Sequence, residues 1–165
     1  MRRRSLLAAF AVAPVSAVIG GRGVLAAATQ EVPVEISVIH ATRTDGGASM
    51  DPRLRDLPQL TRQQPFVRYN VFKLLDRTQL RIEKGKRLDY GILDGRTLQV
   101  TLVDVTEDDA GQRQGVRYQV RAEIGGPGKR EFLKLLEVSA GANEPFFVGG
   151  QSYRGGTLFL ELAVR

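Results

Sequence analysis

Apolar residues recur at every second position in several segments of this chain, and this period constrains the fold more than any other feature. In residues 116–124, five apolar side chains alternate with four polar ones. A strand with one buried face has this pattern, because successive side chains point to opposite sides. The same alternation predicts strands over 32–38, 80–82, 88–92, 97–102 and 158–164, and 67–75 and 132–138 are further candidates with mixed periodicity.

Turn residues separate these segments. Asp94-Gly95 predicts a tight hairpin between 88–93 and 97–105, because glycine accepts the positive φ that primed turns require. Residues 107–115 and 125–128 are predicted to close two more hairpins. Sequential hairpins between short strands indicate a mainly β fold, an antiparallel β-sandwich or a flattened barrel.

One short helix is predicted between the first strand and the others. Asp51 is a suitable N-cap, and Pro52 suits the first helical position. Pro58 is expected to keep this helix short or kinked. Its apolar residues, at three-residue spacing, are predicted to be Leu54, Leu57 and Leu60.

The first 28 residues have the composition of a removable export signal. Arginines at positions 2–4 precede an apolar run over 5–19, and small residues before Thr29 predict cleavage after Ala28. The run is shorter than the roughly 18 residues that span a membrane, so an uncleaved anchor is not favoured. Residues 3–7 are similar to the twin-arginine export motif, which leaves that route and general secretion as alternatives.

Removal of this signal peptide changes the charge of the chain. The full sequence has 24 basic and 18 acidic residues, and four of the basic ones lie in residues 1–28, which leaves 20 against 18. A net charge near +2 does not indicate a nucleic-acid partner, which calls for clustered Lys and Arg. Residues 29–165 are enough for one domain with an ordinary hydrophobic core.

The residue types present restrict the possible chemistry. The chain has no cysteine and one histidine, His40, which excludes thiolate and multi-histidine metal sites. We therefore expect no cofactor and no metal. His40 is interpreted as bonding to backbone at the end of the first strand, and the alternative is a general base for one of the serines. Candidates for that serine are Ser37, Ser49, Ser139 and Ser152.

Two acidic segments have both a structural and a cation-binding interpretation. Residues 44–51 contain two carboxylates, but their spacing does not match an EF-hand loop, so a turn followed by a helix cap is favoured. Residues 107–109 are acidic and are predicted to lie at a solvated hairpin tip. Neither segment is predicted to be a metal site.

Four basic residues form a possible binding patch. They surround Gly85 and could meet an acidic polysaccharide, a lipid headgroup or a charged protein face. The alternative is a solvated strand edge protected by lysine, because acidic residues flank the group. The residues of this secondary patch are Arg81, Lys84, Lys86 and Arg87.

The segment 145–158 is the preferred candidate for a binding loop. Two glycine pairs bracket an aromatic residue and an arginine, a composition suited to a partner or a sugar ring. Tyr153 is predicted to stack on the ligand, and Arg154 to bond to an anionic or carbonyl group, with Gln151 beside them. The structural alternative is a hairpin that needs glycine to turn.

Several features occur in a characteristic order along the chain. They are the leader, a strand ending Ile39-His40-Ala41, the segment Asp51-Pro52-Arg53-Leu54, Pro65-Phe66 with Tyr69, residues 94–98, and the glycine pairs 149–150 and 155–156. In this order the chain resembles uncharacterised exported β-rich proteins of Gram-negative bacteria. The resemblance covers most of residues 29–165 and implies a fold and a compartment, but no activity and no catalytic residues.

Two classes of function follow from these observations. The first is an exported periplasmic or extracellular non-catalytic β-domain that binds a protein or glycan partner in the cell envelope, through loops or a strand edge. The alternative is a small hydrolase that acts on cell-wall or polysaccharide substrate through two carboxylates. No such pair can be chosen from the sequence, so we predict that the protein is not an enzyme.

Overall fold

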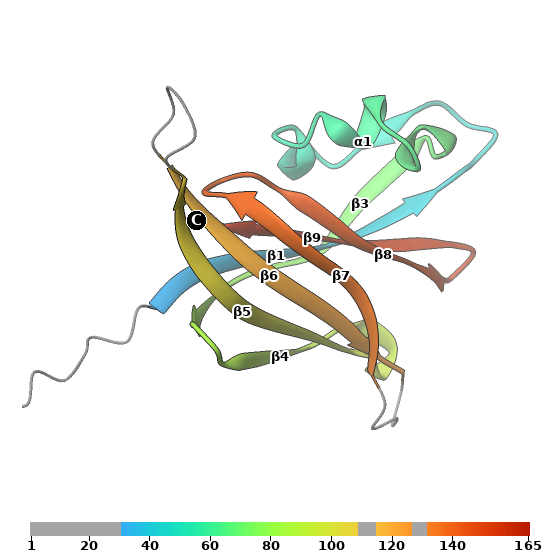
Figure 1. Ribbon diagram of the computed structural model, residues 1–165. Coiled ribbons are helices and arrows are strands. Elements are labelled where there is room, and N and C mark those ends of the chain that lie inside the picture. Colours follow the sequence, from blue (N-terminus) through green and yellow to red (C-terminus); the bar gives the residue numbers. More distant parts are fainter. Residues whose placement is uncertain (1–30, 109–114, 127–131) are drawn as a thin grey trace, which may run out of the picture.

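The computed structural model describes residues 31–108, 115–126 and 132–165, and the predicted signal peptide lies outside them. The described chain is mainly β and forms two sheets (Figure 1). Sheet A has the order β2 (Ser49–Met50), β3 (Val71–Glu83), β1 (Glu31–Thr42), β9 (Gly156–Val164), β8 (Phe146–Tyr153). Sheet B has the order β4 (Arg87–Gly91), β5 (Thr97–Asp108), β6 (Gly115–Gly125), β7 (Phe132–Gly141).

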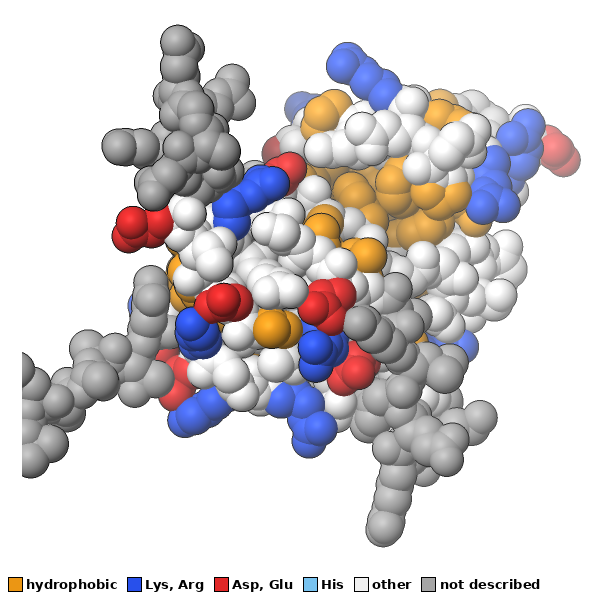
Figure 2. Space-filling view, in the orientation of Figure 1, with side chains coloured by type: hydrophobic (Ala, Val, Ile, Leu, Met, Phe, Trp, Pro, Cys, Tyr) orange, Lys and Arg blue, Asp and Glu red, His pale blue; other side chains and the backbone are white. Residues whose placement is uncertain are grey.

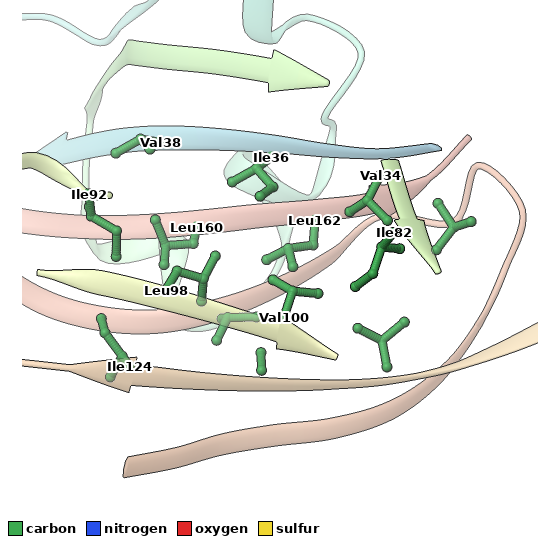
Figure 3. Close-up of a cluster of buried hydrophobic side chains, with 14 of the residues drawn as sticks. Val34, Ile36, Val38, Ile82, Ile92, Leu98, Val100, Ile124, Leu160 and Leu162 are labelled. Carbon is green, nitrogen blue, oxygen red and sulfur yellow. The ribbon is translucent and has the colours of Figure 1, made fainter. Parts of the chain in front are cut away.

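The strands of the two sheets enclose one main hydrophobic core. Side chains of β1 point toward those of β5, with β9 contributing Leu160 and Leu162 (Figure 3). Ile36, Leu98 and Val100 are completely buried there. All neighbouring strands pair antiparallel except β2 and β3, which pair in parallel over two residues. This arrangement supports the β-sandwich among the predicted folds.

A second hydrophobic cluster lies on the outer face of sheet A. Residues 51–70, here called the helical cap, cover one end of this face (Figure 1). The cap consists of the 3-10 helix η1 (Pro52–Leu54), the helix α1 (Gln59–Arg62) and the 3-10 helix η2 (Phe66–Arg68). Its side chains Leu54, Leu57 and Leu60 are buried, as the spacing of the leucines predicts.

The cap differs from the single helix that we predicted. Asp51 does cap the first turn, because its Oδ1 accepts a hydrogen bond from the Arg53 amide at 3.0 Å. The turn then ends at Leu54, and the four-residue α1 starts only after Pro58. Proline cannot donate a backbone hydrogen bond in a helix interior, so Leu54 and Leu60 lie in two separate short helices and Leu57 lies between them.

Strand β9 is buried on both faces, which corrects the expectation of a half-buried strand. The main core covers Leu158, Leu160 and Leu162, and the helical cap covers Phe159 on the other side. Ala163, which follows Leu162 in the strand, is also completely buried. The alternation identified the inner face correctly, but it could not show that a second layer covers the outer one.

Strand β3 is continuous, although the sequence suggested a mixed segment followed by a short strand. Val38 pairs with Asp76 and Ile39 pairs with Leu74, so Leu75 is an extra residue at a β-bulge. A bulge reverses the faces of the residues beyond it. Phe72 and Leu74 therefore contact the cap cluster, whereas Leu80 and Ile82 pack in the main core.

The predicted turns agree with the structure to different degrees. Strands β4 and β5 form the predicted hairpin, and Gly95 has a φ of 78°. The turn is longer than two residues, because it contains the 3-10 helix η3 (Leu93–Gly95). The antiparallel pairs β5–β6 and β6–β7 agree with the other two hairpins. Their tips, 109–114 and 127–131, lie outside the described residues.

Candidate functional site

The predicted binding loop proves to be largely a strand. Gln151 and Tyr153 belong to β8, and Gly149-Gly150 forms a bulge within it rather than a turn. The turn consists of Arg154 and Gly155, both with positive φ. Tyr153 is half-buried against the main core, and the Arg154 guanidinium lies 5.1 Å from the centre of its ring. The three predicted residues are therefore close together, with Arg154 the exposed one.

His40 packs beside this turn. Its Nε2 lies 3.1 Å from the carbonyl oxygen of Tyr153, and the two rings meet edge to face with centroids 5.4 Å apart. The interpretation of His40 as a residue that bonds to backbone is confirmed. Gly156 allows this close approach, because an added Cβ would lie 2.5 Å from the Ala41 carbonyl oxygen and 2.6 Å from His40 Nε2.

The four residues of the predicted basic patch are each matched by an acid. They lie where the chain passes from β3 in sheet A to β4 in sheet B, and not on a hairpin, so we call them the basic crossover. Lys84 Nζ lies 2.5 Å from Asp104 Oδ1, and Lys86 Nζ lies 2.7 Å from Glu83 Oε2. The other two pairs are Arg81 with Glu31 at 3.8 Å and Arg87 with Asp89 at 3.4 Å.

An apolar pocket of about 250 Å³ opens beside the helical cap. None of its lining residues is charged, and the exposed side chain of Val67 stands at its wall. Tyr69 is anchored because its hydroxyl donates to Thr157 Oγ1 at 2.8 Å, close to the β8–β9 turn. The lining residues are Ala48, Ser49, Met50, Thr61, Val67, Tyr69, Asn70 and Phe72.

Three exposed arginines belong to the segments around this pocket without lining it, and we call them the rim arginines: Arg43, Arg62 and Arg68. Arg62 and Arg68 follow the lining residues Thr61 and Val67 in the chain. Arg43 Nη1 donates to the carbonyl oxygen of Arg68 at 3.1 Å, and the Arg68 guanidinium lies 5.6 Å from the centre of the Tyr69 ring. Figure 2 shows Lys and Arg side chains beside hydrophobic ones at this side of the molecule.

The loop before the cap is a hydrogen-bonded turn, as the structural interpretation of 44–51 predicts. Asn70 Oδ1 accepts from the Thr44 amide at 2.9 Å, and its Nδ2 donates to the Thr44 and Gly46 carbonyls. Asp51 is paired with Arg53 at 2.7 Å, and its hydrogen bonds to Arg53 hold the pKa of the Asp51 carboxyl well below its usual range. Asn70 therefore fixes one wall of the pocket.

Glu161 is a buried carboxylate on the outer face of sheet A that the sequence analysis did not single out. Neither of its oxygens has a hydrogen-bond partner within the described chain. It lies opposite Ser37, whose hydroxyl accepts from Arg77 Nε at 3.0 Å. Burial raises the pKa of Glu161, and Glu35 adds to this rise. The Ser37 hydroxyl opposes this rise most, followed by the arginines Arg165 and Arg77.

Metal sites and membrane spans were sought in the same residues. The described ranges contain no group of three or more His, Asp or Glu side chains placed to hold a metal ion. Within those ranges no helix has the length and apolar character needed to cross a membrane. Of the acidic tip 107–109, Asp109 lies outside the described residues.

Comparison of the chain with protein-family models, curated proteins and solved structures finds no significant match. The function has to be inferred from the residues of this chain. Sequence reasoning found the turn with Tyr153 and Arg154 but not the pocket or its rim arginines. The pocket residues come from three separate segments, 48–50, 61 and 67–72, so no local sequence pattern identifies them.

Proposed function

We propose that residues 29–165 form a single β-sandwich domain that is exported and acts as a non-catalytic binding module for a protein partner in the cell envelope. The pocket beside the helical cap carries this proposal. A concave apolar site on an otherwise packed domain is suited to receive an apolar group of a partner. The proposed site also includes the turn with Arg154. Tyr69 of the pocket wall is hydrogen-bonded to Thr157, which lies at the start of β9 just after this turn.

A protein partner is favoured over a glycan by the surroundings of Tyr153. Sugar recognition by stacking needs an accessible aromatic face. The Tyr153 ring is half-buried, it meets the edge of His40, and the Arg154 guanidinium lies over it. We therefore assign Tyr153 a supporting role and Arg154 a contacting role.

No site among the described residues favours the hydrolase alternative. No carboxylate lines the pocket, although glycoside hydrolysis needs two of them in one cleft. Glu161 is enclosed, and the exposed carboxylate of Asp104 is paired with Lys84. The proposal of a binding module does not depend on any titratable group.

Export is part of the proposal and is supported by the composition of residues 1–28. We expect the protein recovered from the envelope or medium to begin at Thr29, which an intact-mass measurement checks. A chain that retains residues 1–28 after fractionation with the cytoplasm would contradict export. The route, general secretion or twin-arginine, is then decided by inactivating each system in turn.

The binding proposal is tested by capture of a partner from the envelope fraction with tagged, processed protein. Thr61→Trp fills the pocket from its wall, and Gln63→Trp places the same side chain outside the lining residues as a matched control. Arg154→Asn removes the exposed cation but keeps a residue that tolerates positive φ. We expect mass spectrometry to find a partner that Gln63→Trp retains and Thr61→Trp loses. A partner retained equally by both variants would place binding elsewhere.

A further inference from the structure

We propose that the apolar pocket and its rim arginines bind an acidic peptide segment of the partner, with one large apolar side chain of that segment inserted in the pocket. This inference rests on the proposed function and specifies the partner's chemistry at the same site. Three features of the described residues carry it: the size of the pocket, the state of the arginines and the edge of sheet A.

The pocket matches one large side chain. Its volume of about 250 Å³ lies below the roughly 300 to 1,000 Å³ of pockets that enclose whole drug-sized ligands. Phe72 and Met50 form part of an apolar wall, and the hydroxyl of Tyr69 is already engaged with Thr157. Protein interfaces commonly obtain much of their binding energy from such an anchor in a fitted pocket.

The rim arginines have no carboxylate partner among the described residues. In the described part of the chain, no carboxylate lies within ion-pair distance of Arg43, Arg62 or Arg68, and Asp45 of the same loop is not paired with any of them. Two of these arginines are nevertheless held in place by carbonyl groups, because Arg43 bonds to Arg68 and Arg68 Nε donates to Pro65 at 3.2 Å. Oriented cations without counter-charges favour acidic residues in a partner.

The edge of sheet A adds a place for an extended main chain. Strand β2 is the edge strand, and its residues Ser49 and Met50 also line the pocket. The amides of Ser49 and Asp51 donate toward β3, to Asn70 and Phe72 at 2.8 and 2.9 Å. The backbone groups of the intervening residue, Met50, point to the open edge because they alternate along a strand. A peptide added there brings alternate side chains over the pocket.

These features favour a peptide over an anionic lipid. A lipid offers a charged headgroup and an apolar chain, but it cannot pair with a strand edge. A long acyl chain also exceeds a pocket that suits a single side chain. A peptide with acidic residues on either side of one aromatic or large aliphatic residue uses the pocket, the rim and the edge together.

The test is selection from a random-peptide phage library on the processed protein, followed by fluorescence anisotropy with labelled copies of the enriched peptides. We expect enriched sequences in which acidic residues flank one large apolar residue. Replacing that residue by serine in the peptide should abolish measurable binding. Enrichment of neutral or basic sequences, or no enrichment, would overturn the inference.

Charge reversal locates the acidic contacts. We expect Arg43→Glu/Arg68→Glu to weaken peptide binding by about ten-fold or more, and Lys84→Glu/Lys86→Glu to change it by less than about two-fold. Binding should also weaken as salt is raised, and this dependence should shrink in the rim variant. Equal losses in the two double variants would overturn the assignment to the rim.

These results can be separated from failure of the proposed function. If Thr61→Trp loses an envelope partner but the selected peptides are not acidic, the binding module stands and the acidic segment falls. If an envelope partner is captured but does not depend on the pocket, binding lies elsewhere and the acidic segment falls with the pocket, and if no envelope partner is captured, the proposed function itself falls. Circular dichroism of each variant verifies its fold, and the exposed arginine and lysine variants give an answer even where Thr61→Trp does not fold.

Discussion

The basic crossover and the rim arginines are both exposed groups of cations, yet they differ in what surrounds them. Each crossover residue lies within 4.0 Å of a carboxylate, so the local charge is largely balanced. Among the described residues, Arg43 and Arg68 donate to backbone carbonyls and no carboxylate pairs with any rim arginine, and the segments that carry these arginines surround an apolar pocket. A basic cluster in the sequence is thus a weaker indicator of a binding surface than cations that the fold leaves without carboxylates.

The difference has a simple physical basis. An exposed ion pair contributes little to stability, but it does lower the attraction for a charged partner. The crossover combines pairs that are local in the chain, such as Arg87 with Asp89, with pairs between separate segments, such as Lys84 with Asp104, which suits a protected edge. At the rim, acidic residues of a partner would supply the missing counter-charges. Two changes test the structure around the pocket end and two test the contrast between the cation groups, beginning with the largest expected effect.

The strongest prediction concerns Gly156, which supports the pocket end of the molecule. Gly156→Ala should lower the free energy of unfolding by about 2 to 3 kcal/mol, because the added methyl group overlaps Ala41, Thr42 and His40. Gly47→Ala is the matched control at the same end, with no atom near its added Cβ. Urea denaturation measures both. Similar free energies of unfolding for the two variants would contradict the close packing around Gly156.

The next prediction concerns Glu161, a buried acid whose oxygens have no hydrogen-bond partner within the described chain. Burial raises the pKa of Glu161 in the folded chain. The stability that comes from protonation of this group is fully present below the pKa of an ordinary glutamate, and it is lost as pH rises through the higher pKa of the folded state. Glu161→Gln should therefore be more stable than the native chain at and above pH ~7, by about 1 kcal/mol, with a flatter pH profile. Denaturation between pH ~5 and ~8 measures this.

The exposed variant Glu107→Gln is the control for Glu161→Gln, since it also removes one carboxylate. It should leave the pH profile of the native chain unchanged. Parallel pH profiles for the native chain and Glu161→Gln would contradict the account of the buried carboxylate.

A smaller effect is expected from single neutral substitutions in the two basic groups. Arg68→Ala should weaken partner binding about three-fold, because one cation near the pocket and its contact with Tyr69 are lost. Lys84→Ala should leave the affinity unchanged. Anisotropy titrations of the captured partner or the selected peptide measure both, and a larger loss with Lys84→Ala would reverse the ranking of the two groups.

The smallest effect is expected in the crossover itself. Arg87 and Asp89 form an exposed pair at 3.4 Å, so a double-mutant cycle with alanine should give a coupling free energy within about 0.5 kcal/mol. Chemical denaturation of the four proteins measures this coupling. A coupling free energy well above about 0.5 kcal/mol would mean that the crossover pairs stabilise the fold, and do not only neutralise one another's charge.

Much of the fold follows from the period of the sequence, and the departures have identifiable causes. Alternation located β6, β5 and β9, because each keeps one face in the main core. It became ambiguous in β3, where the bulge at Leu75 moves the apolar stripe from the cap side to the core side. In residues 145–158 the glycine pair Gly149 and Gly150 predicts a loop, but the structure places this pair at a bulge within strand β8.

The candidate site was less accessible to sequence reasoning. Composition alone pointed to Tyr153 and Arg154, and the structure places them in contact at the β8–β9 turn. Of the rim arginines, Arg62 and Arg68 follow Arg43 by 19 and 25 residues, and no local sequence pattern distinguishes the three from other solvated arginines. Their common feature, the absence of an ion pair with any carboxylate of the described residues, arises only when the chain is folded.

Site-specific crosslinking tests most directly the claim that the partner binds at the pocket. The chain has no cysteine, so Val67→Cys at the pocket and Val116→Cys at the start of β6 each give one site for a photoreactive maleimide. Both native valines are exposed, at 44% and 37%. In the native envelope we predict a crosslinked partner from position 67 and none from position 116. A partner crosslinked equally from both positions, or only from 116, would contradict the account.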